Sequence, residues 1–122
     1  SQANEQKLMA KDGTDLPPLE QLLLLDDGRF RHYFAGTPVR RAGYDRFMRN
    51  ILIAAGNSGD TALVPLVRTY LDYRATVVRA MAVWALSQLM DQQAWVMLKH
   101  QYLPAEMDDT VRREWNDGQH FL

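Results

Sequence analysis

The strongest helical pattern in the chain lies in residues 76–89, which read TVVRAMAVWALSQL. Apolar side chains keep a helical period there over about three turns, at Val78, Met81, Ala82, Ala85, Leu86 and Leu89. Weaker stripes with the same period run through residues 44–55 and 63–71, and again through residues 95–102. No stretch alternates polar and apolar residues for long enough to predict a strand. The sequence therefore predicts an all-α fold.

The predicted helices also recur at a nearly constant spacing. Arg79 and Arg112 each follow a valine early in a predicted helix, and Arg49 is expected at the same place in an earlier helix. The pair Tyr70-Leu71 recurs as Tyr102-Leu103. Paired helices at a fixed period are typical of an α-solenoid, in which each hairpin buries its apolar face against the next. We therefore expect a short α-α superhelix of helical hairpins.

A chain of 122 residues is long enough for one domain with its own core. We expect residues 1–43 to form N-terminal helices that cap the superhelix, followed by a basic loop rich in glycine and proline. Residues 44–122 are expected to form the helical hairpins, and both parts together to make one compact domain. Residues 1–12 are predicted as a polar helix that residues 13–15 end.

Helix boundaries can be placed from capping and breaking residues. Gly36, Pro38 and Gly43 exclude a regular helix between residues 35 and 43, and residues 56–59 are expected to end the helix before them. Aspartate is a favoured N-cap because its side chain accepts from backbone N–H groups left free in the first turn. The predicted caps are Asp26 or Asp27, Asp60, Asp91, and Asp108 or Asp109.

The composition excludes several classes of protein. No apolar run reaches the roughly 18–20 residues of a membrane-spanning helix, so we expect no membrane association. The chain has no cysteine, which excludes disulfides, thiolate zinc sites, cysteine-ligated iron–sulfur clusters and cysteine nucleophiles within it. A reducing cytoplasm is compatible with this composition, and we expect the protein to act there. Because the chain opens at Ser1, we also expect it to be part of a longer protein.

Positive charge is concentrated in one stretch, although the net charge of the chain is only −1. Between residues 29 and 59 the basic residues are all arginine and Asp45 is the only acid; the arginines are Arg29, Arg31, Arg40, Arg41, Arg46 and Arg49. Arginine is preferred to lysine where planar, bidentate contacts to phosphate matter. The stretch therefore predicts an anion-binding surface, and the alternative is a solvated helix face with local ion pairs.

Other residues give no catalytic pattern. His32, His100 and His120 lack the spacing of a metal site, and Ser58 lacks the Gly-x-Ser-x-Gly context of a nucleophile. Three tryptophans, Trp84, Trp95 and Trp115, fall where helices could bury them, so core packing is favoured over an exposed platform for stacking bases. We expect no catalytic residue, cofactor site or metal site in this chain.

Two stretches resemble the C-terminal region of epoxyqueuosine reductase: FAGTPVRR at residues 34–41 and DRFMRNILIAAGNSGD at residues 45–60. Residues 18–31 are similar to the linker that precedes this region in the family. Residues 76–86 resemble a short HEAT-type repeat, which makes the expected superhelix HEAT-like.

The resemblance implies a parent oxidoreductase that reduces epoxyqueuosine to queuosine in the anticodon loop of tRNA. It also implies cobalamin and two [4Fe–4S] clusters, held by N-terminal domains that this chain lacks and with which it would pack. This chain would contribute to the tRNA-binding surface and would not catalyse the reduction alone.

The residues implied in that role form two groups. The first is the basic loop, which could also lie near the active site: Gly36, Thr37, Pro38, Arg40 and Arg41. The second is a set of RNA-contacting arginines on flanking helices: Arg29, Arg31, Arg46 and Arg49.

The alternative function is a HEAT-like scaffold for protein–protein interaction. In that case Trp84, Trp95 and Tyr102 would anchor a partner protein. A contiguous arginine patch with buried tryptophans favours RNA, whereas exposed aromatic residues in an acidic groove favour a protein partner.

Overall fold

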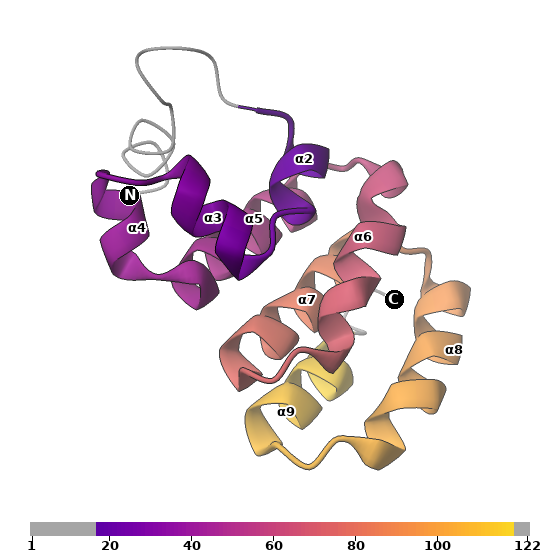
Figure 1. Cartoon of the computed structure of the whole chain (residues 1–122). Helices are drawn as coiled ribbons and strands as arrows, with labels where there is room; N and C mark the ends of the chain where they lie inside the picture. Colours follow the sequence, from indigo (N-terminus) through magenta and orange to yellow (C-terminus); the bar gives the residue numbers. More distant parts are fainter. Residues whose placement is uncertain (1–16, 119–122) are drawn as a thin grey trace.

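The computed structural model describes residues 17–118, so the predicted helix at 1–12, its end at 13–15 and His120 lie outside the described residues. Regular structure within the described range is entirely helical, which confirms the predicted all-α fold (Figure 1). The α-helices are α2 (Leu19–Leu23), α3 (Asp27–Tyr33), α4 (Pro38–Ala42), α5 (Tyr44–Asn57), α6 (Val64–Arg68), α7 (Thr76–Leu89), α8 (Gln92–Tyr102) and α9 (Asp109–Asp117). Short 3₁₀ turns are η1 (Thr61–Leu63), η2 (Thr69–Asp72) and η3 (Leu103–Ala105).

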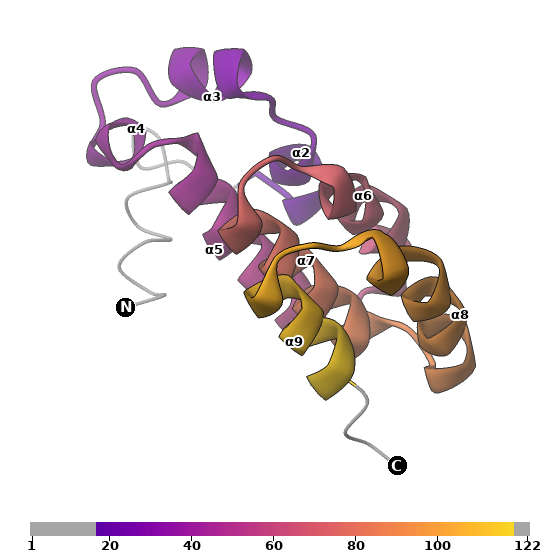
Figure 2. The ribbon, with the colours of Figure 1, turned by 90° about the horizontal axis from the view of Figure 1, so that it is seen from below.

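The helices form two layers. α7 packs between α5 and α9, and these three helices run side by side in Figure 2. α6 and α8 lie on the other side of α7, so that each outer helix follows an inner one along the chain. α2 covers α5 and α6, while α3 and α4 lie around the beginning of α5 (Figure 1). Inner and outer helices therefore alternate along the chain from α5 to α9.

Small residues let the two main helices approach closely. Ala82 and Ala85 of α7 are fully buried, and a Cβ added at Gly56 of α5 would lie 2.4 Å from Cζ3 of Trp84 and 3.0 Å from Cα of Ala85. The sequence assigned Gly56 to the turn after the helix, which was wrong, because α5 continues to Asn57. Gly56 is needed where α5 crosses α7, and the turn glycine is Gly59, whose φ is +70°.

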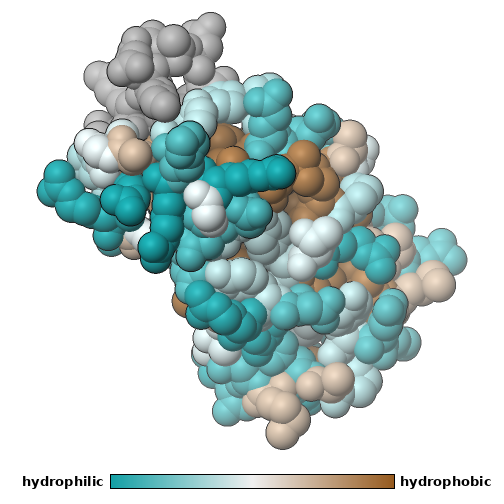
Figure 3. Space-filling model, viewed as in Figure 1, coloured by the Kyte–Doolittle hydropathy of each residue, from teal (hydrophilic) through white to brown (hydrophobic). Residues whose placement is uncertain are grey.

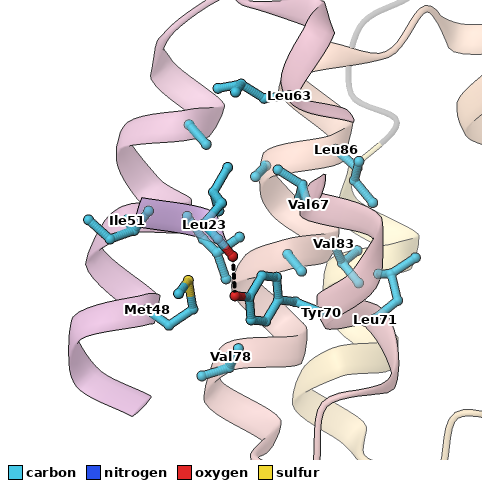
Figure 4. Packing of buried hydrophobic residues seen from close by; sticks show 14 of the residues in the cluster. Leu23, Met48, Ile51, Leu63, Val67, Tyr70, Leu71, Val78, Val83 and Leu86 are labelled. Carbon is cyan, nitrogen blue, oxygen red and sulfur yellow. Dashed lines mark hydrogen bonds between the residues drawn. The ribbon is translucent and has the colours of Figure 1, made fainter. Parts of the chain in front are cut away.

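Two tyrosines attach the N-terminal segment to the hairpins. Tyr70 donates a hydrogen bond of 2.5 Å from its hydroxyl to the carbonyl oxygen of Leu23 at the end of α2 (Figure 4). Tyr44 donates one of 2.5 Å to the carbonyl oxygen of Leu25, and the two hydroxyl oxygens are 3.2 Å apart. Burial raises the pKa of both phenols, so both stay protonated donors. We call this pair the tyrosine clip.

A repeated arginine fixes the connection before α7 and the one before α9. Arg79 is the fourth residue of α7, and its Nη1 donates to the carbonyl oxygens of Tyr73 at 2.9 Å and Arg74 at 3.2 Å. Arg112 is the fourth residue of α9 and donates from Nη1 to the carbonyl oxygens of the preceding connection in the same way. Arg49 was expected to match them. It is instead the sixth residue of α5 and is exposed, so that part of the repeat prediction was wrong.

The capping predictions agree with the structure. Each helix or 3₁₀ turn concerned begins after an aspartate whose side chain accepts from a backbone N–H; these are Asp26, Asp60, Asp91 and Asp108. The segment after Asp60 was expected to be one helix, but it consists of η1, α6 and η2. Pro65 lies in the first turn of α6, and its missing N–H prevents a continuous helix from Thr61 onward. No helix in residues 17–118 is long and apolar enough to cross a membrane.

Candidate nucleic-acid interface

The basic stretch contains a short helix that the sequence did not predict. Residues 38–42 form α4, although glycine and proline on either side suggested a loop. Thr37 caps this helix by accepting from the backbone N–H of Arg40 at 3.4 Å, and Pro38 occupies the first turn, where its missing N–H is not needed. Gly43, with φ at +94°, ends it. The punctuating residues therefore mark the ends of a helix, whose exposed face carries Arg40 and Arg41.

An aromatic cluster holds this region on the hairpins. The ring of Phe30 in α3 lies 4.8 Å from the ring of Phe47 in α5, and that of Phe34, directly after α3, lies 5.3 Å from it, measured between centroids. All three side chains are almost fully buried, and aromatic pairs at this separation are stabilising beyond the area that they bury. α3 and α5 therefore form a fixed base, with α4 between them in the chain.

A hollow of about 590 Å³ lies between α3, α4 and the beginning of α5. Its lining includes five arginine side chains: Arg31, Arg40, Arg41, Arg46 and Arg74. Gly36 and Thr37 also line it, and Phe30 and Tyr44 contribute aromatic surface. Strongly hydrophilic side chains gather over this end of the molecule in Figure 3. We call this feature the arginine hollow.

The arginine hollow has more positive charge than its own carboxylates can balance. Asp27 pairs with Arg31 at 3.3 Å, and Asp45 pairs with Arg74 at 3.6 Å. Within the described part of the chain, Arg40, Arg41 and Arg46 form no ion pair, and no other acidic residue lines the hollow. The existing pairs are exposed, and such pairs contribute little to stability. The hollow is therefore suited to an anionic ligand.

The structure brings together most, but not all, of the residues predicted for the site. Six of the nine line the arginine hollow: Gly36, Thr37, Arg31, Arg40, Arg41 and Arg46. Pro38, Arg29 and Arg49 are exposed but do not line it.

Arg74 lines the arginine hollow and was missed by the sequence reasoning. It follows η2 and lies outside the basic stretch, so charge density along the chain gave no signal for it. Its guanidinium carbon lies 5.4 Å from the centroid of the Tyr73 ring, in a cation–π arrangement. The hydroxyl of Tyr73 in turn donates a short hydrogen bond to Asp45 Oδ1. Burial, together with that carboxylate, raises the pKa of Tyr73 to about 12, so the phenol remains a donor at neutral pH.

The chemistry that the lining of the arginine hollow offers is that of anion binding. The lining of the arginine hollow has no histidine, cysteine or serine. Residues 17–118 contain no cluster of three or more histidine, cysteine or acidic side chains that could hold a metal ion. The guanidinium groups of the lining can bind and orient an anion.

The tryptophans pack in or against the core. Trp95 and Trp115 are each 1 % exposed, and their rings lie 4.8 Å apart. Trp84 is partly buried and lies over the position where α5 crosses α7. Trp95 is therefore inaccessible as an anchor for a partner protein, and neither it nor Trp115 offers a platform for bases.

Comparison with known proteins identifies relatives of the chain. No family model matches it. The chain is 30 % identical over 86 residues to an epoxyqueuosine reductase of Xanthomonas campestris pv. campestris, which is 70 % of this chain and 24 % of the relative. It is 32 % identical over 73 residues to an epoxyqueuosine reductase of Pseudomonas aeruginosa, covering 59 % of this chain and 20 % of the relative.

Solved structures of similarly named enzymes share the fold. An epoxyqueuosine reductase from Bacillus subtilis superposes with a TM-score of 0.75 at 25 % identity over 84 % of this chain and 27 % of its own length. A structure of epoxyqueuosine reductase with an epoxyqueuosine-modified tRNA stem loop gives a TM-score of 0.76 at 23 % identity over the same shares. The chain spans about a quarter of the length of these relatives. The predicted resemblance is thus confirmed, and the chain is a homologue of one segment of the epoxyqueuosine reductases.

Proposed function

We propose that this chain is the HEAT-like, RNA-contacting part of an epoxyqueuosine reductase that acts in the cytoplasm, and that the arginine hollow binds backbone phosphates of its tRNA. The observation that carries the proposal is the surplus of unpaired arginine in the hollow, on a chain homologous to those enzymes. A related enzyme has been solved with a modified tRNA stem loop, which supports tRNA as the partner.

The chemistry of the lining suits phosphate in particular. Guanidinium presents a planar fork of N–H donors that matches two phosphate oxygens, and it is desolvated at lower cost than an ammonium group. The hollow has no exposed tryptophan, and Phe30 in its lining is only 1 % exposed. Contact with the sugar–phosphate backbone is therefore favoured there over stacking on bases. Arg29 and Arg49, outside the hollow, would extend this surface along α3 and α5.

The reduction itself would occur in the rest of the parent enzyme. The resemblance implies a cobalamin and two [4Fe–4S] clusters there, but no cysteine in this chain could ligate a cluster. We assign no chemical step to this chain. In this proposal residues 1–43 join the hairpins of 44–122 to the domains that carry the cofactors, and the chain orients the tRNA against them.

The test compares two triple variants of equal net charge. One removes Arg40, Arg41 and Arg46 from the arginine hollow, and the control removes Arg68, Lys99 and Arg113, which lie outside it and outside the surface proposed here. Each is changed to alanine in the parent enzyme, and binding of an epoxyqueuosine-modified tRNA stem loop is measured against salt concentration.

The hollow variant should lose about two to three units of the slope of log K against log salt, at about 0.7 to 0.9 per lost phosphate contact. The control should retain most of the slope, because its three basic residues lie elsewhere. Equal losses in both variants would mean that only net charge matters. Unchanged binding by the hollow variant would contradict the proposed role outright.

A further inference from the structure

The turn between η2 and α7 brings one arginine into the hollow from a different part of the fold. The other four arginines belong to residues 31–46, in α3, α4 and the beginning of α5. Arg74 precedes α7, the central helix of the hairpins. A ligand that fills the arginine hollow would therefore touch both the N-terminal helices and the turn that leads into α7. We call this turn together with α7 and α8 the second hairpin.

The side chain of Arg74 is oriented although it is exposed. Its Nη2 lies 3.6 Å from Asp45 Oδ2, and its guanidinium sits over the ring of Tyr73. The same carboxylate accepts from the Tyr73 hydroxyl through its other oxygen. Tyr73 thus fixes the carboxylate of Asp45, and that carboxylate in turn limits the rotamers open to Arg74. The side chain remains 77 % exposed, so its remaining N–H donors are available to a ligand.

The backbone beneath Arg74 is also fixed. Arg79 donates to the carbonyl oxygens of Tyr73 and Arg74, and it is itself paired with Glu106 through two hydrogen bonds of 3.0 and 2.8 Å. The Arg79 and Glu106 side chains are only 18 % and 10 % exposed. This ion pair fastens the turn to the connection before α9, so the Cα of Arg74 has a fixed place relative to the hairpins.

We propose that Arg74 is a phosphate-binding residue of the arginine hollow, and that Asp45 is the residue that positions it. The inference rests on the proposed function and adds a contact from the second hairpin to those from α3, α4 and α5. Preorganisation explains why a carboxylate lies in a site for an anion: Asp45 repels phosphate, but it reduces the rotamer entropy that Arg74 would lose on binding.

The two effects of Asp45 have opposite signs, which makes the proposal testable. If Asp45 acted only through its charge, Asp45→Asn would remove repulsion and tighten RNA binding. If Asp45 positions Arg74, the same change should weaken binding about threefold, on the scale of one freed rotamer-rich side chain. Arg74→Ala should weaken binding about tenfold, as expected for one charge-assisted hydrogen bond. It should also lower the salt slope by slightly less than one unit.

The experiment is a double-mutant cycle in the parent enzyme with the modified tRNA stem loop as probe. Asp45→Asn is measured in the wild-type and in the Arg74→Ala background, with Arg68→Ala as the charge-matched control and circular dichroism as the check on folding. We expect the weakening by Asp45→Asn to vanish or reverse once Arg74 is absent. Tyr73→Phe, which removes the donor to Asp45, should reproduce part of the effect of Asp45→Asn.

The outcomes separate this inference from the proposed function. If Arg74→Ala behaves like Arg68→Ala while the triple hollow variant loses binding, Arg74 is no ligand and only this inference is overturned. Tighter binding by Asp45→Asn in the wild-type background would overturn the positioning role. If the triple hollow variant binds as the wild type does, the proposed function fails and this inference fails with it.

Discussion

Gly56 offers a stringent test of the packing, because a single added methyl group should drive α5 and α7 apart. The change is Gly56→Ala, one residue before the end of α5, where that helix lies against Trp84 and Ala85 of α7. Considered locally the substitution is favourable, since alanine in a helix interior is about 1 kcal/mol better than glycine. The structure predicts the opposite result.

The magnitude follows from the atoms that the new Cβ would meet. Cζ3 of Trp84, 2.4 Å away, belongs to a side chain that could shift, but Cα of Ala85, at 3.0 Å, belongs to the backbone of α7. Overpacking of this kind costs about 1–3 kcal/mol. After the gain in helix propensity is subtracted, we expect a net loss of up to about 2 kcal/mol. Gly28→Ala is the matched control, because its Cβ would meet only Asp26 Oδ1 at 3.6 Å, and it should be neutral or stabilising by up to about 1 kcal/mol.

The assay is urea unfolding followed by circular dichroism. With a slope of about 2 kcal/mol per molar urea, Gly56→Ala should lower the midpoint by up to about 1 M. In a Trp84→Leu background, which removes the ring, the cost of the added methyl group should shrink but persist, because the backbone contact remains. A Gly56→Ala protein as stable as the Gly28→Ala control would refute the close approach of α5 and α7.

Three further changes test the contacts that hold the fold and the site. Glu106→Gln should destabilise the protein by about 3 kcal/mol at neutral pH, because Arg79 is left without its buried partner. The hydrogen bonds from Arg79 hold the pKa of Glu106 below its ordinary value of 4.5. The pairing energy is therefore present above pH 4.5 and is lost as the pH falls through the pKa of the folded state. The difference in unfolding free energy between wild type and variant, measured by urea unfolding, should shrink in acid. Tyr70→Phe should cost about 1–2 kcal/mol in the same assay, because the carbonyl oxygen of Leu23 loses its donor. Thr37→Ala should cost about 1 kcal/mol and weaken RNA binding with little change in the salt slope, because fraying of α4 leaves Arg40 and Arg41 less well oriented while their charge is unchanged.

The helices could be predicted from the sequence because their information is local. The stripe through residues 76–89 and the aspartate caps need only neighbours along the chain, and the structure confirms them. Gly56 was misassigned because a turn glycine and a contact glycine look alike in sequence. Only Trp84 and Ala85, far along the chain but adjacent in space, reveal which one it is.

In the candidate site, too, some features could be predicted from neighbours along the chain and others are visible only in the fold. Residues 40, 41 and 46 were found because charge is dense in one stretch. The helix α4 was not found, since Pro38 and Gly43 were read as breaks rather than as the two ends of a helix. Arg74 could not have been found by charge density, because the fold alone brings it beside that stretch. The family resemblance was visible because residues 34–60 form a long and unusual string, which does not depend on the fold.

The tyrosine clip has a consequence for how this part of the chain can diverge. Tyr44 and Tyr70 bind the carbonyl oxygens of Leu25 and Leu23, and every amino acid carries such an oxygen. The attachment itself therefore imposes no preference on the side chains of its acceptors, and Leu24 between them is exposed. Relatives can be expected to retain the two phenols as a pair, while any constraint on the side chain of Leu23 comes from its burial in the core and not from the hydrogen bond. Where one phenol is replaced, the other should be lost as well, because a single remaining hydrogen bond would not fix the orientation of α2.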